Sequence, residues 1–108
     1  MPSVFKSNGS NEIGTVSTIV YTAPAGSQVT VIGMSVANVV ATSVLVTATL
    51  TKGSTVTNII KQSPVPTGSS AVLVGGNQKL VLEAGNTVSV LSNTASSVDC
   101  IVSVLEIT

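Results

Sequence analysis

The chain has 108 residues and no net charge, and only 7% of its side chains are charged and 2% aromatic, whereas 44% are hydrophobic. This length is enough for one domain that buries a core without disulfides or metals. Four Lys/Arg residues and so few rings exclude the cationic, base-stacking surface that nucleic acids require, and no apolar run is long enough for a membrane helix. We therefore expect neither nucleic acid nor membrane as a partner.

The first 14 residues are polar, rich in Gly and Asn, and show no hydrophobic period. They predict an N-terminal arm or lead-in, followed by a single domain over residues 15–108. Val4 and Phe5 are the only adjacent pair of large apolar residues in the arm. Phe5 either lies on its own domain or is mobile, or it anchors the arm on a neighbouring subunit.

The segment 15–22 alternates as a strand and ends at Pro24-Ala25-Gly26. A long strand follows over residues 28–38. Its apolar residues change parity partway along, with Gly33 inside the change, which indicates a β-bulge or a strand covered on both faces.

Residues 44–51 give the clearest alternation in the chain, with one apolar face and one mostly hydroxyl face. Lys52-Gly53-Ser54 predicts a hairpin turn into a strand over residues 55–62. Two prolines and a glycine in 63–70 predict a loop or crossover between the sheets.

The stretch 71–90 reads as strand, loop, strand, tight turn, strand, with Gly85-Asn86 able to form the turn. Leu80 and Leu82 before the turn and Val88 and Val90 after it predict an antiparallel pair. The last strand, 98–107, has large apolar residues on both parities, so we expect it in the middle of a sheet or under a partner.

These elements predict an all-β protein of about eight strands in an antiparallel β-sandwich. A jelly-roll-like sandwich is preferred, with an immunoglobulin-like sandwich as the alternative. The pattern does not determine the strand order.

Turn and strand motifs follow one another along most of the chain, from about Thr15 to the end: Ile19-Val20-Tyr21-Thr22 with Pro24-Ala25-Gly26, Ser35-Val36-Ala37-Asn38, Val65-Pro66-Thr67-Gly68-Ser69-Ser70, Lys79-Leu80-Val81-Leu82-Glu83-Ala84-Gly85-Asn86 and Ser103-Val104-Leu105-Glu106-Ile107. In this series the chain resembles small β-sandwich virion proteins of tailed bacteriophages. Such proteins usually decorate or cement the capsid, and related domains occur in neck and tail parts.

Catalytic, metal and cofactor sites are not indicated. The chain has no His to activate a nucleophile or ligate a metal, and Gly75-Gly76 lacks the Lys and Ser/Thr of a phosphate-binding loop. The four carboxylates are far apart in sequence, and we expect them to be solvated: Glu12, Glu83, Asp99 and Glu106. Cys100 is expected to be a buried, inert thiol, and a single cysteine is consistent with folding in a reducing cytoplasm. We expect no enzyme and no cofactor.

The resemblance implies a virion protein, assembled in the host cytoplasm, that binds the outer capsid surface and bridges capsomers. Its partner would be the major capsid protein or another virion protein. A surface with few ions favours association, so we expect a homo-oligomer. The resemblance to capsid decoration proteins, which often sit on local threefold axes, implies a trimer as the preferred state. The alternatives are a neck, tail or fibre component, or a glycan-binding adhesin module. Candidate contacts with a subunit or the capsid are Val4, Phe5, Lys79 and Glu83, the last of which is also placed to meet Lys79 or a partner's lysine.

Overall fold

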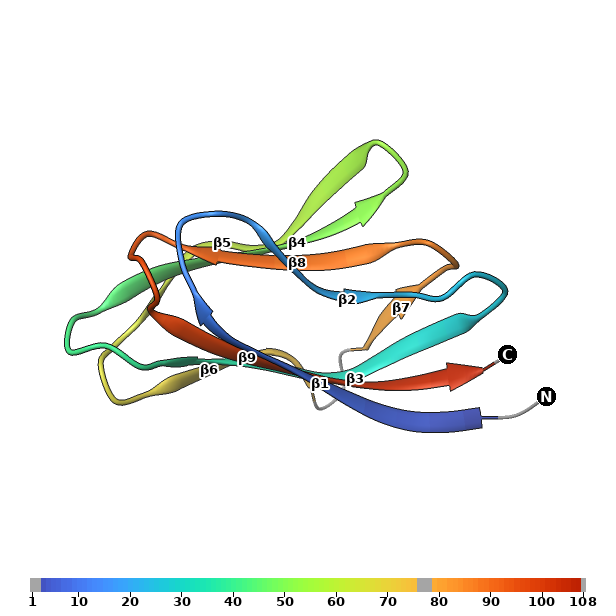
Figure 1. Ribbon diagram of the computed structural model, residues 1–108, viewed down its shortest axis with the longest axis horizontal. Helices are drawn as coiled ribbons and strands as arrows, with labels where there is room; N and C mark the ends of the chain where they lie inside the picture. The colour runs from blue at the N-terminus through green and yellow to red at the C-terminus, as the bar shows by residue number, and fades with distance from the viewer. Residues whose placement is uncertain (1–2, 76–78, 108) are drawn as a thin grey trace.

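The computed structural model describes residues 3–75 and 79–107, which form nine β-strands and no helix. The strands are β1 (Ser3–Ile13), β2 (Thr18–Thr22), β3 (Gln28–Asn38), β4 (Val44–Lys52), β5 (Thr55–Val65), β6 (Ser70–Val74), β7 (Leu80–Leu82), β8 (Thr87–Ser92) and β9 (Val98–Ile107). They make two antiparallel sheets that lie face to face (Figure 1). The predicted all-β sandwich is confirmed. No helix in the described part of the chain is long and apolar enough to cross a membrane.

Strand order identifies the sandwich as a jelly roll. Sheet A has the order β1-β9-β3-β6, and β7 also pairs with β3; sheet B has the order β2-β8-β4-β5. Since β6 pairs with residues 34–37 of β3 and β7 with residues 29–31, both antiparallel, they are two halves of one edge strand. If β6 and β7 are counted as one strand, β8 and β9 become the seventh and eighth strands. The two sheets then have the orders 1-8-3-6 and 2-7-4-5, which is the arrangement of a jelly roll.

The predicted antiparallel pair around Gly85 is wrong. The turn itself is present, with the Asn86 N–H donating to the Glu83 carbonyl at 3.0 Å and Gly85 at φ +84°. However, β7 before it pairs with β3 in sheet A, whereas β8 after it pairs with β2 and β4 in sheet B. The turn therefore carries the chain across the sandwich, because alternation shows which face of a strand is buried but not which strand lies beside it.

The predicted irregularity in β3 is confirmed as a bulge. The register of β3 against β9 shifts between Val31 and Gly33, and the buried positions change from Val29 and Val31 to Met34 and Val36. β9 lies between β1 and β3, so the prediction that the last strand is central is also confirmed.

We expected an arm over residues 1–14. In the structure, Ser3–Ile13 form β1, the edge strand of sheet A, which pairs antiparallel with β9 and begins with Ser3 opposite Ile107. The sequence lacked an apolar period here because nearly all β1 side chains are exposed and backbone hydrogen bonds hold the strand. β5 likewise extends beyond the predicted Gln62 to Val65, since Pro64 lies in an edge strand, where a missing N–H is tolerated.

The core between the sheets is aliphatic and dominated by valine. Valines from both sheets are almost fully buried, together with the larger Ile13, Met34 and Leu82. Each such side chain stabilises the fold by about 1.5–3 kcal/mol relative to exposure. Aromatic packing contributes little, because Tyr21 is the one buried ring.

Candidate protein-contact surface

A row of mainly apolar side chains crosses the outer face of sheet A at one end of the sandwich. Phe5 on β1 is opposite Leu105 on β9, Leu105 is opposite Thr30 on β3, and Thr30 is opposite Val81 on β7. Residues directly opposite in an antiparallel ladder project from the same face. Phe5 is 73% exposed and Val81 is 63% exposed, so the two ends of this row lie open to solvent.

A second row crosses the same face nearer the other end. Gly9, Ile101, Ser35 and Val72 are opposite one another in turn on β1, β9, β3 and β6. Ile101 and Val72 are more than half exposed. Among the paired positions that share this face, Asp99 is the one ionised side chain; the others are apolar, hydroxyl, amide or glycine residues. We call the two rows the sheet A face.

The outer face of sheet B has a different chemistry. Its central positions on β4 are Thr47, Thr49 and Thr51, which alternate with the buried residues of that strand. This confirms the predicted, mostly hydroxyl face of residues 44–51. The exposed apolar side chains on this side are Ile19 and Val56, at the two edge strands, and Leu45 at the start of β4.

The four predicted contact residues do not form one site. Phe5 projects from the sheet A face, whereas its neighbour Val4 is opposite Glu106 on the inner side of β1. Lys79 is exposed directly before β7. Glu83 forms an ion pair with Lys52, from the β4–β5 hairpin, and both side chains are 63% exposed. Such an exposed pair adds little stability.

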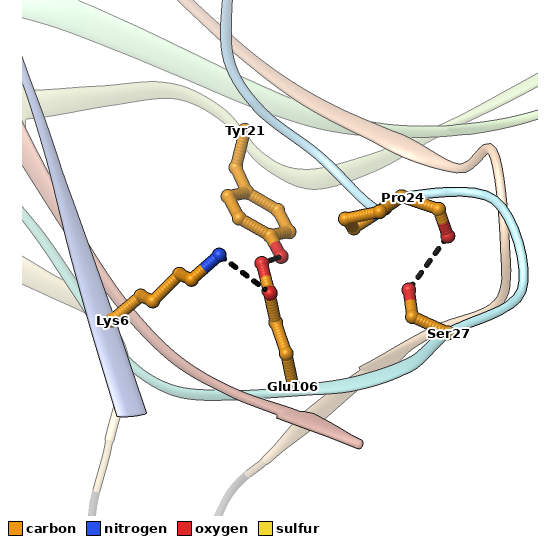
Figure 2. A network of polar contacts seen from close by, with 5 residues as sticks. All are labelled: Lys6, Tyr21, Pro24, Ser27 and Glu106. Carbon is orange, nitrogen blue, oxygen red and sulfur yellow. Dashed lines mark hydrogen bonds and ion pairs between the residues drawn. The ribbon is translucent and has the colours of Figure 1, made fainter. Parts of the chain in front are cut away.

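The structure contains a buried polar network that was not predicted from the sequence (Figure 2). Glu106 on β9 accepts a hydrogen bond from the hydroxyl of Tyr21 on β2, and its other oxygen lies 2.9 Å from Nζ of Lys6 on β1. The carboxylate is buried, whereas the Lys6 side chain is 51% exposed. The expectation that Glu106 is solvated is therefore wrong.

The network perturbs the protonation of both acidic groups. The hydrogen bond from Tyr21, followed by the one from Lys6, lowers the pKa of Glu106 against the opposing effect of burial. Burial, and then the hydrogen bond to Glu106, raises the pKa of Tyr21 well above its ordinary value. At neutral pH the network thus holds a carboxylate and a neutral phenol, and Glu106 joins one strand of sheet B to two strands of sheet A.

One signal in the sequence pointed to this network. Val98, Cys100, Val102 and Val104 alternate along β9 as the buried set, and Glu106 continues the same parity. A carboxylate at the end of a buried row requires partners, and Tyr21 was the only phenol in the chain able to supply one.

Two further features of the described residues are a buried thiol and an open surface hollow. Cys100 is buried, as predicted, and burial raises the pKa of its thiol to about 11. An open hollow of about 360 Å³ lies where β1 loses its register with β9, lined by Gly9, Ser10, Asn11, Asp99, Cys100 and Ile101. In the described residues no cluster of three or more His, Cys, Asp or Glu is arranged to hold a metal ion.

No family model and no curated protein matches this sequence. Similar folds occur among solved structures. One is a protein of the disulfide-linked pili that form Bacillus endospore appendages, with a TM-score of 0.59 and 17% identity over 98% of this chain and 88% of that chain. Two others come from infectious bursal disease virus: a chain of the Gx strain, with a TM-score of 0.54 and 8% identity, and a mutant VP2 protein in derived T=1 particles, with a TM-score of 0.51 and 9% identity.

The matches to the two viral proteins cover 96% of this chain, which spans about a third of their length, 36% and 35% respectively. At identities of 17% and below, these similarities establish the fold. The chain thus shares its jelly-roll sandwich with a pilus protein and with part of a viral capsid protein.

Proposed function

We propose that this protein is a structural subunit of a virion or a comparable assembly, and that it binds protein neighbours through the sheet A face. The observation that carries the proposal is the chemistry of that face, where Phe5, Val72, Val81 and Ile101 are each more than half exposed and Asp99 is the one ionised side chain at the paired positions. Apolar surface gathered in this way is typical of interaction sites.

The size of the face is adequate for a stable interface. The molecule measures 45 × 27 × 22 Å, and the two sheets stack along the intermediate dimension (Figure 1). Each broad face therefore measures about 1,000 Å², compared with the roughly 800 Å² per partner of a standard protein interface. The related fold of the pilus protein supports the proposal, since a sandwich of this size makes up 88% of that chain.

The state of the carboxylates supports a role other than catalysis. Glu106 is engaged by Tyr21 and Lys6, Asp99 accepts a hydrogen bond from the Glu12 backbone N–H at 3.0 Å, and Glu83 pairs with Lys52. With no His in the sequence, these groups lack the arrangement that general acid–base or nucleophilic catalysis needs.

In its specific form, the proposal is a decoration or cement protein of a tailed-phage capsid. Each copy, most simply within a trimer, would lay its sheet A face on the major capsid protein and bridge neighbouring capsomers, adding contacts that must break before the shell opens. Because few ions take part, binding should depend only weakly on salt.

Particles stripped of the protein test this proposal. We expect them to rupture at a lower temperature than complete particles and to recover when the protein is added back. The variant Phe5→Ser/Val81→Ser should bind at least about tenfold more weakly, because it removes both open ends of the first apolar row. The matched control is Ile19→Ser/Val56→Ser, which removes side chains 59% and 61% exposed from the opposite sheet and should bind normally.

Equal rupture temperatures of stripped and complete particles would exclude the cement role. Equal binding by the two double variants would exclude the sheet A face. Copy number distinguishes the alternative position in a neck, tail or fibre: hundreds of copies per particle indicate the capsid, and a handful indicates the tail. A glycan-binding module would have to stack sugars on Phe5, since Tyr21 is buried.

A further inference from the structure

The first part of β1 is held to the sandwich by its backbone ladder with β9 and by the ion pair of Lys6 with Glu106, and little by apolar packing. From Ser3 opposite Ile107 to Ser10 opposite Cys100, the ladder with β9 runs without interruption. Over this stretch the side chains of residues 3–9 are exposed, and that of Ser10 is half-buried. On the other side of β9, by contrast, β3 contributes buried valines and Met34 to the core. Removing Ser3–Ser10 would therefore uncover little apolar surface but would leave one edge of β9 unpaired.

A break separates this segment from the rest of the chain. The register of β1 against β9 shifts between Ser10 and Ile13, and within the break Glu12 has φ +53°, a left-handed conformation unfavourable for a residue with a β-carbon. Beyond the break the chain is firmly attached, because Ile13 is buried and its carbonyl accepts a hydrogen bond from the Ser97 N–H at 2.9 Å. Asn11 and Glu12 thus have the position of a hinge.

We propose that the segment Ser3–Ser10 exchanges between copies of this protein, pairing with β9 of a second copy in the same register. Opening the hinge would release the strained conformation of Glu12, and short strained hinges favour such swapping. Only the same sequence reproduces every contact of the vacated edge, including Lys6 with the buried Glu106. A chain with no net charge opposes this association little.

Disulfide trapping distinguishes an exchanged strand from one held within its own chain. Ser7 and Ser103 are directly opposite on the outer face, at a separation that a disulfide can span. Chains carrying Ser7→Cys alone and chains of a different tagged length carrying Ser103→Cys alone would be refolded together at high concentration and oxidised with diamide. The buried Cys100 is present in both and serves as an internal control for non-specific linkage.

From the mixture of the two single variants we expect a heterodimer linked by a disulfide between position 7 of one chain and position 103 of the other. Chains that carry both Ser7→Cys and Ser103→Cys should give covalent dimers in the oligomeric fraction. Links formed only within single chains in that fraction, or the absence of any oligomer at high concentration, would overturn the proposal. The proposal does not depend on the proposed function, because the test uses the purified chain without particles.

The hinge provides a second measurement. Glu12→Gly removes the penalty of the left-handed conformation from the closed form and should lower the association constant of the exchanged dimer by about tenfold or more. Glu12→Ala removes the carboxylate but keeps the β-carbon, so it should associate like the wild type. Equal association of the Gly and Ala variants would overturn exchange about this hinge.

Discussion

Replacing Tyr21 by Phe tests whether the buried network with Glu106 stabilises the sandwich. The substitution keeps the buried ring and removes the hydroxyl that donates to the carboxylate. A hydrogen bond to a charged group contributes about 1.5–3 kcal/mol, so the free energy of unfolding at pH 7 should fall by that amount. For a domain of 108 residues this corresponds to a decrease in Tm of roughly 6–12 °C in a thermal melt. Lys6→Met should have a smaller effect, because the Lys6 side chain is half exposed.

The pH dependence of the stability difference between the wild type and Tyr21→Phe tests whether the hydrogen bond to Glu106 is its cause. Since the folded-state pKa of Glu106 is lowered, its stabilising contribution is complete above the unfolded pKa of about 4.3 and is lost as the pH falls through the folded-state value. The pKa of Tyr21 is raised in the folded state from its ordinary value of 10.0. The stabilising contribution of Tyr21 is therefore present below pH 10 and is lost as the pH rises above that value. The stability gap between wild type and Tyr21→Phe should therefore be widest near neutrality and should narrow in both acid and alkali.

The chain has a single tyrosine, so alkaline titration of its absorbance reports Tyr21 directly. In the folded protein, tyrosinate should not appear near pH 10 but only at higher pH or together with unfolding. Ordinary ionisation of Tyr21 near pH 10 while the circular dichroism remains native would refute the network, as would a Tyr21→Phe variant as stable as the wild type at pH 7.

Two paired substitutions test the packing and the turn. Leu82→Ala should cost about 2–5 kcal/mol because Leu82 is fully buried, whereas Val81→Ala, one residue away and 63% exposed, should stay within about 0.5 kcal/mol; similar denaturant midpoints would contradict the assigned faces of β7. Gly85→Ala should cost about 1–2 kcal/mol through its φ of +84° alone, since an added β-carbon would meet no atom within 4 Å. The control Gly9→Ala, where an added β-carbon also meets open space, should be neutral or stabilising by up to about 1 kcal/mol. Equal changes in melting temperature for the two variants would contradict a conformational cost at Gly85.

Local features of the fold could be predicted from the sequence because their causes are local. The alternation of residues 44–51, the parity change at Gly33 and the turn at Gly85 each depend on a few neighbouring residues. Strand pairing depends on which sheet edge is available to a strand after the chain has turned. The residues next to that strand in the sequence do not determine this. The strands on either side of Gly85 therefore belong to different sheets, although their patterns match those of a hairpin.

The candidate surface could be predicted only in part, for a related reason. Phe5 was notable because it is a large apolar residue in a polar segment, but the rows that make it part of a surface require the register of four strands. The exposed β1 had no apolar period to reveal it as a strand. Glu106 was detectable from its parity on β9, whereas its pairing with Lys6, 100 positions away in the chain, was not.

The two faces of β1 connect the proposed surface to the proposed exchange. Phe5 projects outward opposite Leu105, and Lys6, the next residue, meets Glu106 on the inner side. A β1 segment supplied by a second copy would carry both Phe5 and Lys6. The first apolar row of the sheet A face would then be restored, with its aromatic side chain supplied by the neighbouring copy. Particle binding would then be compatible with either form of the strand. Exchange would add to the assembly in a different way, because separating two copies would require the backbone ladder of β9 to break as well as the contacts of the face.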